Sequence, residues 1–184
     1  MAKLVSKTYG DALFELATDE NKIDSLFEEA KALKEILDAN DDFRKMMNHP
    51  QISREEKEKV MEDVFKGRAS EEMTGFLRLL IVNGRFVEID SILDYFIAEV
   101  KEFKKIGVAY VTTPLPLSDK QKSDVESKLL NTTSYETMEM NYSVDASLIG
   151  GMTIRIKDRV VDSSVKSKLD KLTKELLDLK LANA

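Results

Sequence analysis

The spacing of apolar residues changes once along this chain, and this change is the strongest constraint on its fold. In residues 1–105, apolar residues recur every three or four positions, which is the period of an amphipathic helix. Residues 108–113 are β-branched and aromatic, and in residues 138–144 apolar and polar residues alternate, as in half-buried strands. We therefore predict an all-α six-helix N-terminal bundle over residues 1–105, followed by a small α+β C-terminal domain over residues 106–184.

The boundaries of the predicted helices follow from local signals. A capping box of Ser53 and Glu56 opens the fourth helix, and Ser70 can cap the fifth. The third helix must end before Pro50, because the residue before proline is pushed out of helical geometry. The six helices are expected at residues 4–17, 23–37, 43–47, 54–66, 71–83 and 86–106.

The predicted fifth helix, from Glu71 to Asn83, is apolar on nearly every side. A helix of this kind lies at the centre of a bundle or offers one face to a partner. The two interpretations are compatible with each other, and the sequence pattern favours the central position.

The second domain is predicted to contain a strand, a helix, three more strands and a last helix. Ser118 and Gln121 form another capping box, so a helix begins there, and a polar loop follows at residues 131–137. The pair Gly150-Gly151 enters a strand directly, whereas a phosphate-binding loop would enter a helix. We therefore interpret these glycines as a bulge or a close backbone approach and disfavour a phosphate loop.

A turn at Lys157-Asp158 should separate that strand from a short one at Val160-Val161. Asp162, Ser163 or Ser164 can then cap the last helix. This helix carries an apolar seam with spacings of four and three, typical of a coiled coil. A partner helix could bind the seam, or the seam could pack on the sheet of its own domain. The seam residues are Val165, Leu169, Leu172, Leu176 and Leu179.

Two sequence patterns resemble one known family. Val144-Asp145, Leu148-Ile149-Gly150-Gly151, Ile154-x-Ile156-x-Asp158 and Asp162-x-Ser164 resemble the C-terminal signature of the delta subunit of rotary F-type ATP synthase. This is the family of the oligomycin-sensitivity-conferring protein. Tyr9-Gly10-Asp11-Ala12-Leu13-Phe14 and Phe76-Leu77-x-Leu79-Leu80-x-x-Asn83-x-Arg85 resemble its first and fifth helices.

The chain departs from the family pattern at single positions. Family members often carry alanine at position 10, where this chain has Gly10, and glycine at position 157, where it has Lys157. From sequence, Gly10 is expected to loosen the first helix by about 1 kcal/mol.

The resemblance implies a non-catalytic stator subunit, present in one copy per complex, that resists torque during proton-driven ATP synthesis. Its N-terminal domain would hold the N-terminal helix of an ATP synthase alpha subunit, and its C-terminal domain would bind the b subunit dimer of the peripheral stalk through the seam. It would lie at the cytoplasmic face of the cell membrane, as a peripheral subunit. The implied contacts with the alpha subunit are Tyr9, Ala12, Leu13, Phe76, Leu80 and Asn83.

Composition excludes several other functions. The chain has no cysteine and one histidine, His49, so it lacks the usual ligands of a zinc site, and we predict no metal and no cofactor. Residues 1–105 contain 17 Lys and Arg against 23 Asp and Glu, which disfavours binding to nucleic acid. No apolar run is long enough to span a membrane, and no signal-peptide core begins the chain, so membrane association is expected only through partners.

Two other functions are alternatives to the stator subunit. A free-standing helical interaction or assembly adaptor would use the same apolar surfaces for a different client. An enzyme with the loop at residues 131–137 as a lid is disfavoured, because no pairing of a nucleophile with a base is evident and no catalytic residue is predicted.

Overall fold

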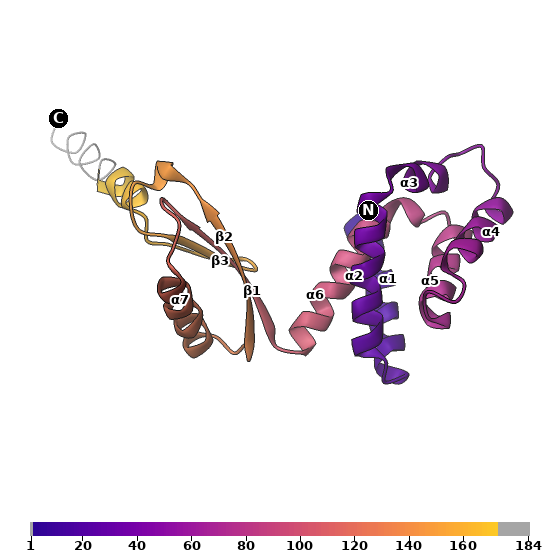
Figure 1. Cartoon of the computed structure of the whole chain (residues 1–184), viewed down its shortest axis with the longest axis horizontal. Helices are drawn as coiled ribbons and strands as arrows, with labels where there is room; N and C mark the ends of the chain where they lie inside the picture. Colours follow the sequence, from indigo (N-terminus) through magenta and orange to yellow (C-terminus); the bar gives the residue numbers. More distant parts are fainter. Residues whose placement is uncertain (1, 173–184) are drawn as a thin grey trace, which may run out of the picture. The chain divides into compact units, whose positions relative to one another are not determined.

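The computed structural model describes residues 2–172. The chain divides into two compact units between Phe103 and Lys104. The first unit is mostly helical, and the second is built on a small four-stranded sheet (Figure 1).

Helices with short connections make up the first unit. Its elements are α1 (Ala2–Asp19), α2 (Ile23–Ala39), α3 (Asp41–Met47), α4 (Arg54–Phe65), α5 (Glu71–Val82), the 3-10 helix η1 (Phe86–Glu88) and α6 (Ile89–Phe103). The capping box predicted for α4 is present: the Ser53 hydroxyl accepts a 3.2 Å bond from the Glu56 N–H, and the Glu56 carboxylate accepts a 3.1 Å bond from the Ser53 N–H.

The predicted start of the sixth helix at Phe86 is wrong, because residues 86–88 form η1. Helix α5 ends in a Schellman motif, in which the Arg85 N–H donates to the Leu80 carbonyl at 2.8 Å and Gly84 has a φ of 64°. The chain then turns sharply, and the Glu88 N–H donates to the Arg85 carbonyl at 3.1 Å. Apolar spacing cannot distinguish a single 3-10 turn from the first turn of an α-helix.

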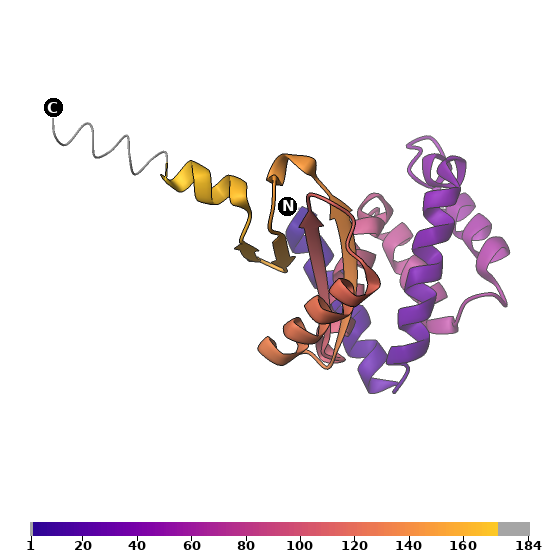
Figure 2. The same cartoon turned by 60° about the vertical axis from the view of Figure 1, so that its left-hand side comes forward.

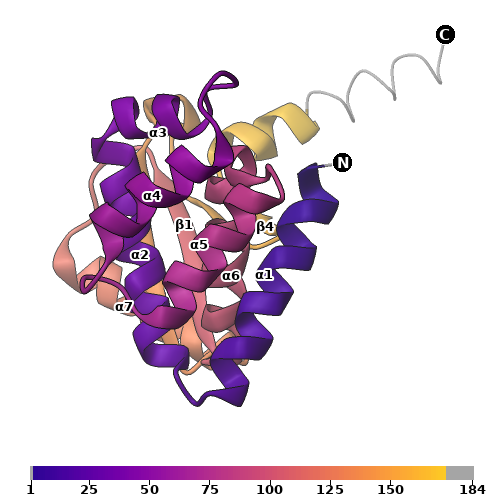
Figure 3. The ribbon, with the colours of Figure 1, turned by 90° about the vertical axis from the view of Figure 1, so that its right-hand side faces the viewer.

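The core of the first unit forms around α6, which packs against α1 and α2 (Figure 3). Phe96 of α6 is fully buried. Tyr95 of α6 lies against Gly10 of α1: a Cβ at position 10 would stand 3.3 Å from Tyr95 Cε1 and closer still to Cδ1. Gly10 is therefore a close-approach position between two helices, which its sequence neighbours did not reveal.

The sheet of the second unit has the strand order β2-β1-β3-β4. Its strands are β1 (Ile106–Thr113), β2 (Thr137–Val144), β3 (Thr153–Ile156) and β4 (Arg159–Asp162). Strands β1 and β2 are parallel, so they need a crossover connection, and α7 (Asp119–Thr132) supplies it. Strand β3 pairs antiparallel with both β1 and β4. The sequence predicted these segments but not that β1 is central.

Helix α7 lies along one face of the sheet (Figure 2). The Tyr142 hydroxyl of β2 reaches the Lys122 carbonyl of α7 at 3.4 Å, so the residues in register with Tyr142 face this helix. Val111 is one of them and is fully buried. On the other face, the Arg155 guanidinium lies 4.8 Å from the centre of the Tyr110 ring, which is a cation–π contact.

Of the two roles considered for the Gly150-Gly151 pair, a bulge or a close backbone approach, the structure shows the close approach. Gly151 has a φ of 77°, and a Cβ there would stand 3.0 Å from the Cα of Ser164. The Val165 N–H donates to the Gly150 carbonyl at 2.9 Å, so the glycines hold the start of the helical residues 165–172. Before this pair, residues Ala146–Leu148 form the 3-10 helix η2.

Candidate protein-binding sites

The first candidate site is a groove between α1 and α5, which run in opposite directions. At one end, the Asn83 side-chain amide donates a 3.1 Å hydrogen bond to the Tyr9 hydroxyl. At the other end, the Lys22 ammonium pairs with the Glu72 carboxylate. These two contacts connect residues far apart in sequence and fix both ends of the groove.

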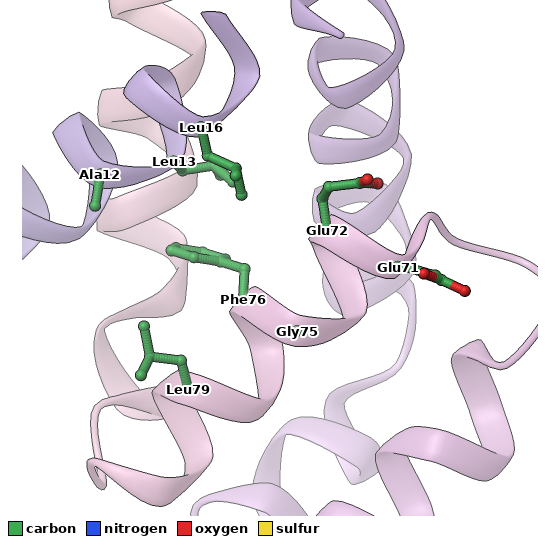
Figure 4. Close-up of a pocket in the computed structure, with 8 residues that line it drawn as sticks. All are labelled: Ala12, Leu13, Leu16, Glu71, Glu72, Gly75, Phe76 and Leu79. Atoms are coloured by element: carbon green, nitrogen blue, oxygen red, sulfur yellow. The ribbon is translucent and has the colours of Figure 1, made fainter. Parts of the chain in front are cut away.

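Apolar side chains from both helices line the groove, which has a volume of about 420 Å³. Figure 4 shows the side chains of Leu13 and Leu16 directed toward those of Phe76 and Leu79 across the space between the helices. The lining residues are Ala12, Leu13 and Leu16 of α1, and Glu71, Glu72, Gly75, Phe76 and Leu79 of α5.

The floor and the rim of this groove differ in exposure. Leu13 and Phe76 are buried, whereas Leu16 is 37% exposed and Leu79 is 46% exposed. Gly75 adds open space, since a Cβ placed there would meet nothing within 4 Å. An apolar floor with half-exposed leucines at the rim suits the apolar face of an amphipathic helix.

One end of the groove is acidic. Glu71 and Glu72 lie in the first turn of α5, where the helix dipole favours carboxylates. The hydrogen bond from the Lys22 ammonium lowers the pKa of the Glu72 carboxyl below its ordinary value. The Ser70 hydroxyl caps α5 by accepting a 3.2 Å bond from the Met73 N–H, and it donates a 2.8 Å bond to Glu29 of α2. This end is therefore ordered by bonds to Glu29 of α2 and to Lys22, the residue that precedes α2.

The structure brings most of the residues predicted for the first site together. Ala12, Leu13 and Phe76 line the groove, and Tyr9 and Asn83 close one end of it. Leu80 does not line the groove, because it has no exposed surface and packs in the core. The sequence does carry a signal for Leu16 and Leu79. They lie three positions after Leu13 and Phe76, and residues three apart share one face of a helix.

The second candidate site is the seam of the last helix. Val165, Leu169 and Leu172 are 37%, 49% and 55% exposed, so their side chains are not buried against the sheet of their own unit. Leu176 and Leu179 lie outside the described residues. The helix is capped by Ser164, whose hydroxyl accepts a 3.2 Å bond from the Ser167 N–H.

Asp162 adds a second set of bonds to this cap. Its carboxylate accepts a 2.8 Å bond from the Ser164 N–H and a 2.5 Å bond from the Ser167 hydroxyl. These bonds lower the pKa of Asp162 to about 2, and the bond from the Ser167 hydroxyl has the largest effect. The Asp162-x-Ser164 pattern thus serves to begin the helix that carries the seam.

Other chemistry finds little support in the described part of the chain. His49 is exposed, and its Nδ1 accepts a 3.3 Å bond from the Gln51 N–H. Among residues 2–172, no group of three or more His, Asp or Glu side chains is placed to hold a metal ion. No helix in that range combines the length and the apolar character required to cross a membrane.

Comparisons with known proteins agree on one family. The sequence model of the family described as ATP synthase delta (OSCP) subunit matches residues 5–176. The chain is 53% identical over 181 residues to the ATP synthase subunit delta of Lachnoclostridium phytofermentans, covering 98% of this chain and 100% of that protein. It is 35% identical to the subunit delta of Brevibacillus brevis, covering 92% and 97%.

A solved structure shares the fold. A chain in the cryo-EM structure of the Toxoplasma gondii mitochondrial ATP synthase hexamer superposes with a TM-score of 0.74, at 22% identity. The match covers 94% of this chain and 97% of that chain.

Proposed function

This chain belongs to the ATP synthase delta (OSCP) subunit family, and from this premise we propose that it is the non-catalytic stator subunit that links the catalytic head of an F-type ATP synthase to its peripheral stalk. The observation that carries the proposal is the apolar groove between α1 and α5, together with a separate exposed apolar seam on the second unit. One subunit with two apolar sites, one on each unit, can join two partners.

The groove on the first unit, a six-helix bundle, holds the N-terminal helix of an alpha subunit. An amphipathic helix would bury its apolar face on Leu13 and Phe76, and Leu16 and Leu79 would close over its sides. The acidic end at Glu71 and Glu72 favours a partner that is basic there, although exposed charges contribute more to the association rate than to affinity.

The seam on the second unit binds the b subunit dimer of the stalk. Val165, Leu169 and Leu172 supply the a and d type positions of a coiled-coil contact, and the seam continues in sequence to Leu176 and Leu179. Burial of about half of each of these side chains against a second helix would stabilise the complex by the hydrophobic effect.

The function is mechanical rather than chemical. Rotation of the central shaft exerts torque on the head during proton-driven ATP synthesis, and one copy of this subunit passes the counter-torque to the stalk. The subunit reaches the cytoplasmic face of the membrane through its partners. Helix-in-groove contacts suit this role because their affinity comes from buried apolar area and does not change during turnover.

The head contact is tested by calorimetric titration of the full chain with the N-terminal peptide of the alpha subunit from the same organism. We expect one-to-one binding, lost in Gly75→Leu, because a leucine at this open position fills the groove. Lys59→Leu is the matched control, since it adds the same side chain to an exposed position of α4 outside the groove. Binding that is unchanged in Gly75→Leu would refute this site.

The stalk contact is tested with the soluble part of the b subunit. Leu172→Glu should weaken this binding while leaving binding of the alpha peptide unchanged, and Lys171→Glu, at a position of the same helix away from the seam, is the charge control. Equal loss of both partners in Leu172→Glu would argue against two separate sites. If the chain binds neither partner and does not co-migrate with ATP synthase subunits, it is instead an adaptor for another client.

A further inference from the structure

A second cavity on the first unit shares no lining residue with the groove. It lies where the end of α3, the start of α4 and the segment from the end of α5 to η1 meet, and its volume is about 520 Å³. Its floor is apolar, since Met47, Ile81 and Phe86 line it and all three are buried.

The rim of this cavity carries two cations and one exposed apolar side chain. Arg54 and Lys57 line it one helical turn apart, and neither forms an ion pair with any side chain in residues 2–172. By contrast, Arg78 of α5 pairs with Glu58 at 2.9 Å. Val87 of η1 also lines the cavity and is 64% exposed.

From these features we propose that the cavity is a docking site for a short acidic protein segment with an apolar anchor residue. The anchor enters over Phe86 and beside Val87, and carboxylates on either side of it pair with Arg54 and Lys57. Exposed charge pairs are weak by themselves, so the apolar anchor supplies affinity and the cations supply selectivity.

The charge of the surroundings selects this class of partner. Residues 1–105 carry six more acidic than basic residues, and a polyanion such as nucleic acid or an anionic membrane would be repelled outside the two cations. A segment with only a few carboxylates, all close to its anchor, experiences less of this repulsion because its charges lie beside the two cations. Such a contact would give the first unit a second partner surface besides the groove.

The test uses the full chain and a capped peptide in which a leucine–phenylalanine pair has two glutamates on each side. When the peptide is added, the backbone amide chemical shifts of the full chain should change around Ile52, Ser53 and Val87. Those around Leu16 and Leu79 should not change. A peptide with glycine and serine in place of the apolar pair should bind at least about tenfold more weakly, since the anchor is the main source of affinity. A peptide with lysines in place of the glutamates should not bind.

The variant Arg54→Glu/Lys57→Glu should lose binding by at least about tenfold, and added salt should weaken binding to the wild type. The acidic replacements lie in the first turns of α4, where the helix dipole favours them, so the variant should remain folded. Lys59→Glu, elsewhere on α4, is the charge control, and Gly75→Leu should leave this binding intact.

Three results would overturn the proposal. They are equal affinity of the wild type and the double variant, shifts confined to the groove between α1 and α5, and complete displacement of the peptide by inorganic phosphate, which would make the cavity a small-anion site. Because Gly75→Leu blocks only the groove, failure here leaves the proposed stator function untouched.

Discussion

The hydroxyl of Tyr95 on α6 donates a 2.9 Å hydrogen bond to Oδ1 of Asp11 on α1. This bond, followed by burial, raises the pKa of Tyr95 to about 12 from an ordinary value of 10.0. The neutral phenol is therefore favoured in the folded state. Its contribution to the free energy of unfolding is complete below pH 10 and is lost as the pH rises from 10 to about 12.

Tyr95→Phe should lower the free energy of unfolding by about 1–2 kcal/mol at neutral pH, because the bond to a carboxylate is lost. Urea unfolding of the wild type and the variant across alkaline pH checks this. The difference between them should shrink as the pH rises through 10 toward 12. A difference that stays constant over that range would show that the phenol does not titrate as the geometry requires.

Gly10→Ala should destabilise the first unit, although alanine favours a helix by about 1 kcal/mol. The new methyl group would press on the Tyr95 ring, and overpacking of this kind costs about 1–3 kcal/mol. Thermal unfolding of the wild type, Gly10→Ala, Tyr95→Ser and the double variant gives a double-mutant cycle. In the Tyr95→Ser background the alanine should become stabilising, and additive effects would refute the close approach.

Lys157→Gly should raise the free energy of unfolding by about 0.5–1 kcal/mol, because Lys157 has a φ of 51° and only glycine adopts that region without steric cost. This turn position is one where the family often has glycine. Asp158→Gly, at the neighbouring position without a positive φ, is the matched control and should destabilise. Denaturant unfolding, monitored by circular dichroism, measures the stability of both variants. If Lys157→Gly destabilises the protein, the backbone of Lys157 is not strained.

Asp162→Asn should remove a dependence of stability on acid pH. The pKa of Asp162 is lowered from 3.8 to about 2 by its bonds from Ser167 and Ser164. The ionised group thus stabilises the folded state fully above pH 3.8, and this contribution is lost as the pH falls toward 2. Unfolding curves of the wild type and the variant should converge over that range. An NMR titration that gives Asp162 an ordinary pKa would exclude the cap.

Leu79 and Leu80 are neighbours in sequence with opposite expected roles. Leu80→Ala should destabilise the first unit by about 2–5 kcal/mol, because the side chain is fully buried. Leu79→Ala should cost much less stability, since the side chain is 46% exposed, but it should weaken binding of the alpha peptide. Unfolding and calorimetry on both variants check this pair. Weaker binding in a fully folded Leu80→Ala, with unchanged binding in Leu79→Ala, would reverse the assignment.

Much of the secondary structure was predictable because its signals are local. The capping boxes at Ser53 and Ser118 formed as predicted, since each involves residues only three positions apart. The family could also be predicted, because the Gly150-Gly151 and Asp162-x-Ser164 patterns describe a close backbone approach and a helix cap that need these residue types.

Which residues form the groove was only partly predictable. Motif positions identified Ala12, Leu13 and Phe76, which line the groove, but they also pointed to Leu80, which is buried in the core. Periodicity shows that a helix such as α5 has apolar residues on several sides. It does not show which side faces the core.

The sequence by itself determined the positions of most helices and strands, the change from helix to sheet, and the family. The tertiary structure decided which side chains meet: that Tyr95 occupies the space beside Gly10, that β1 is central between β2 and β3, and that Leu79 borders a groove. The physical reason is the distance along the sequence over which each kind of interaction acts. Caps, turns and periodicity depend on neighbours within about one helical turn. Packing brings together residues far apart in sequence, and the local sequence around one of them does not show which residue it will contact.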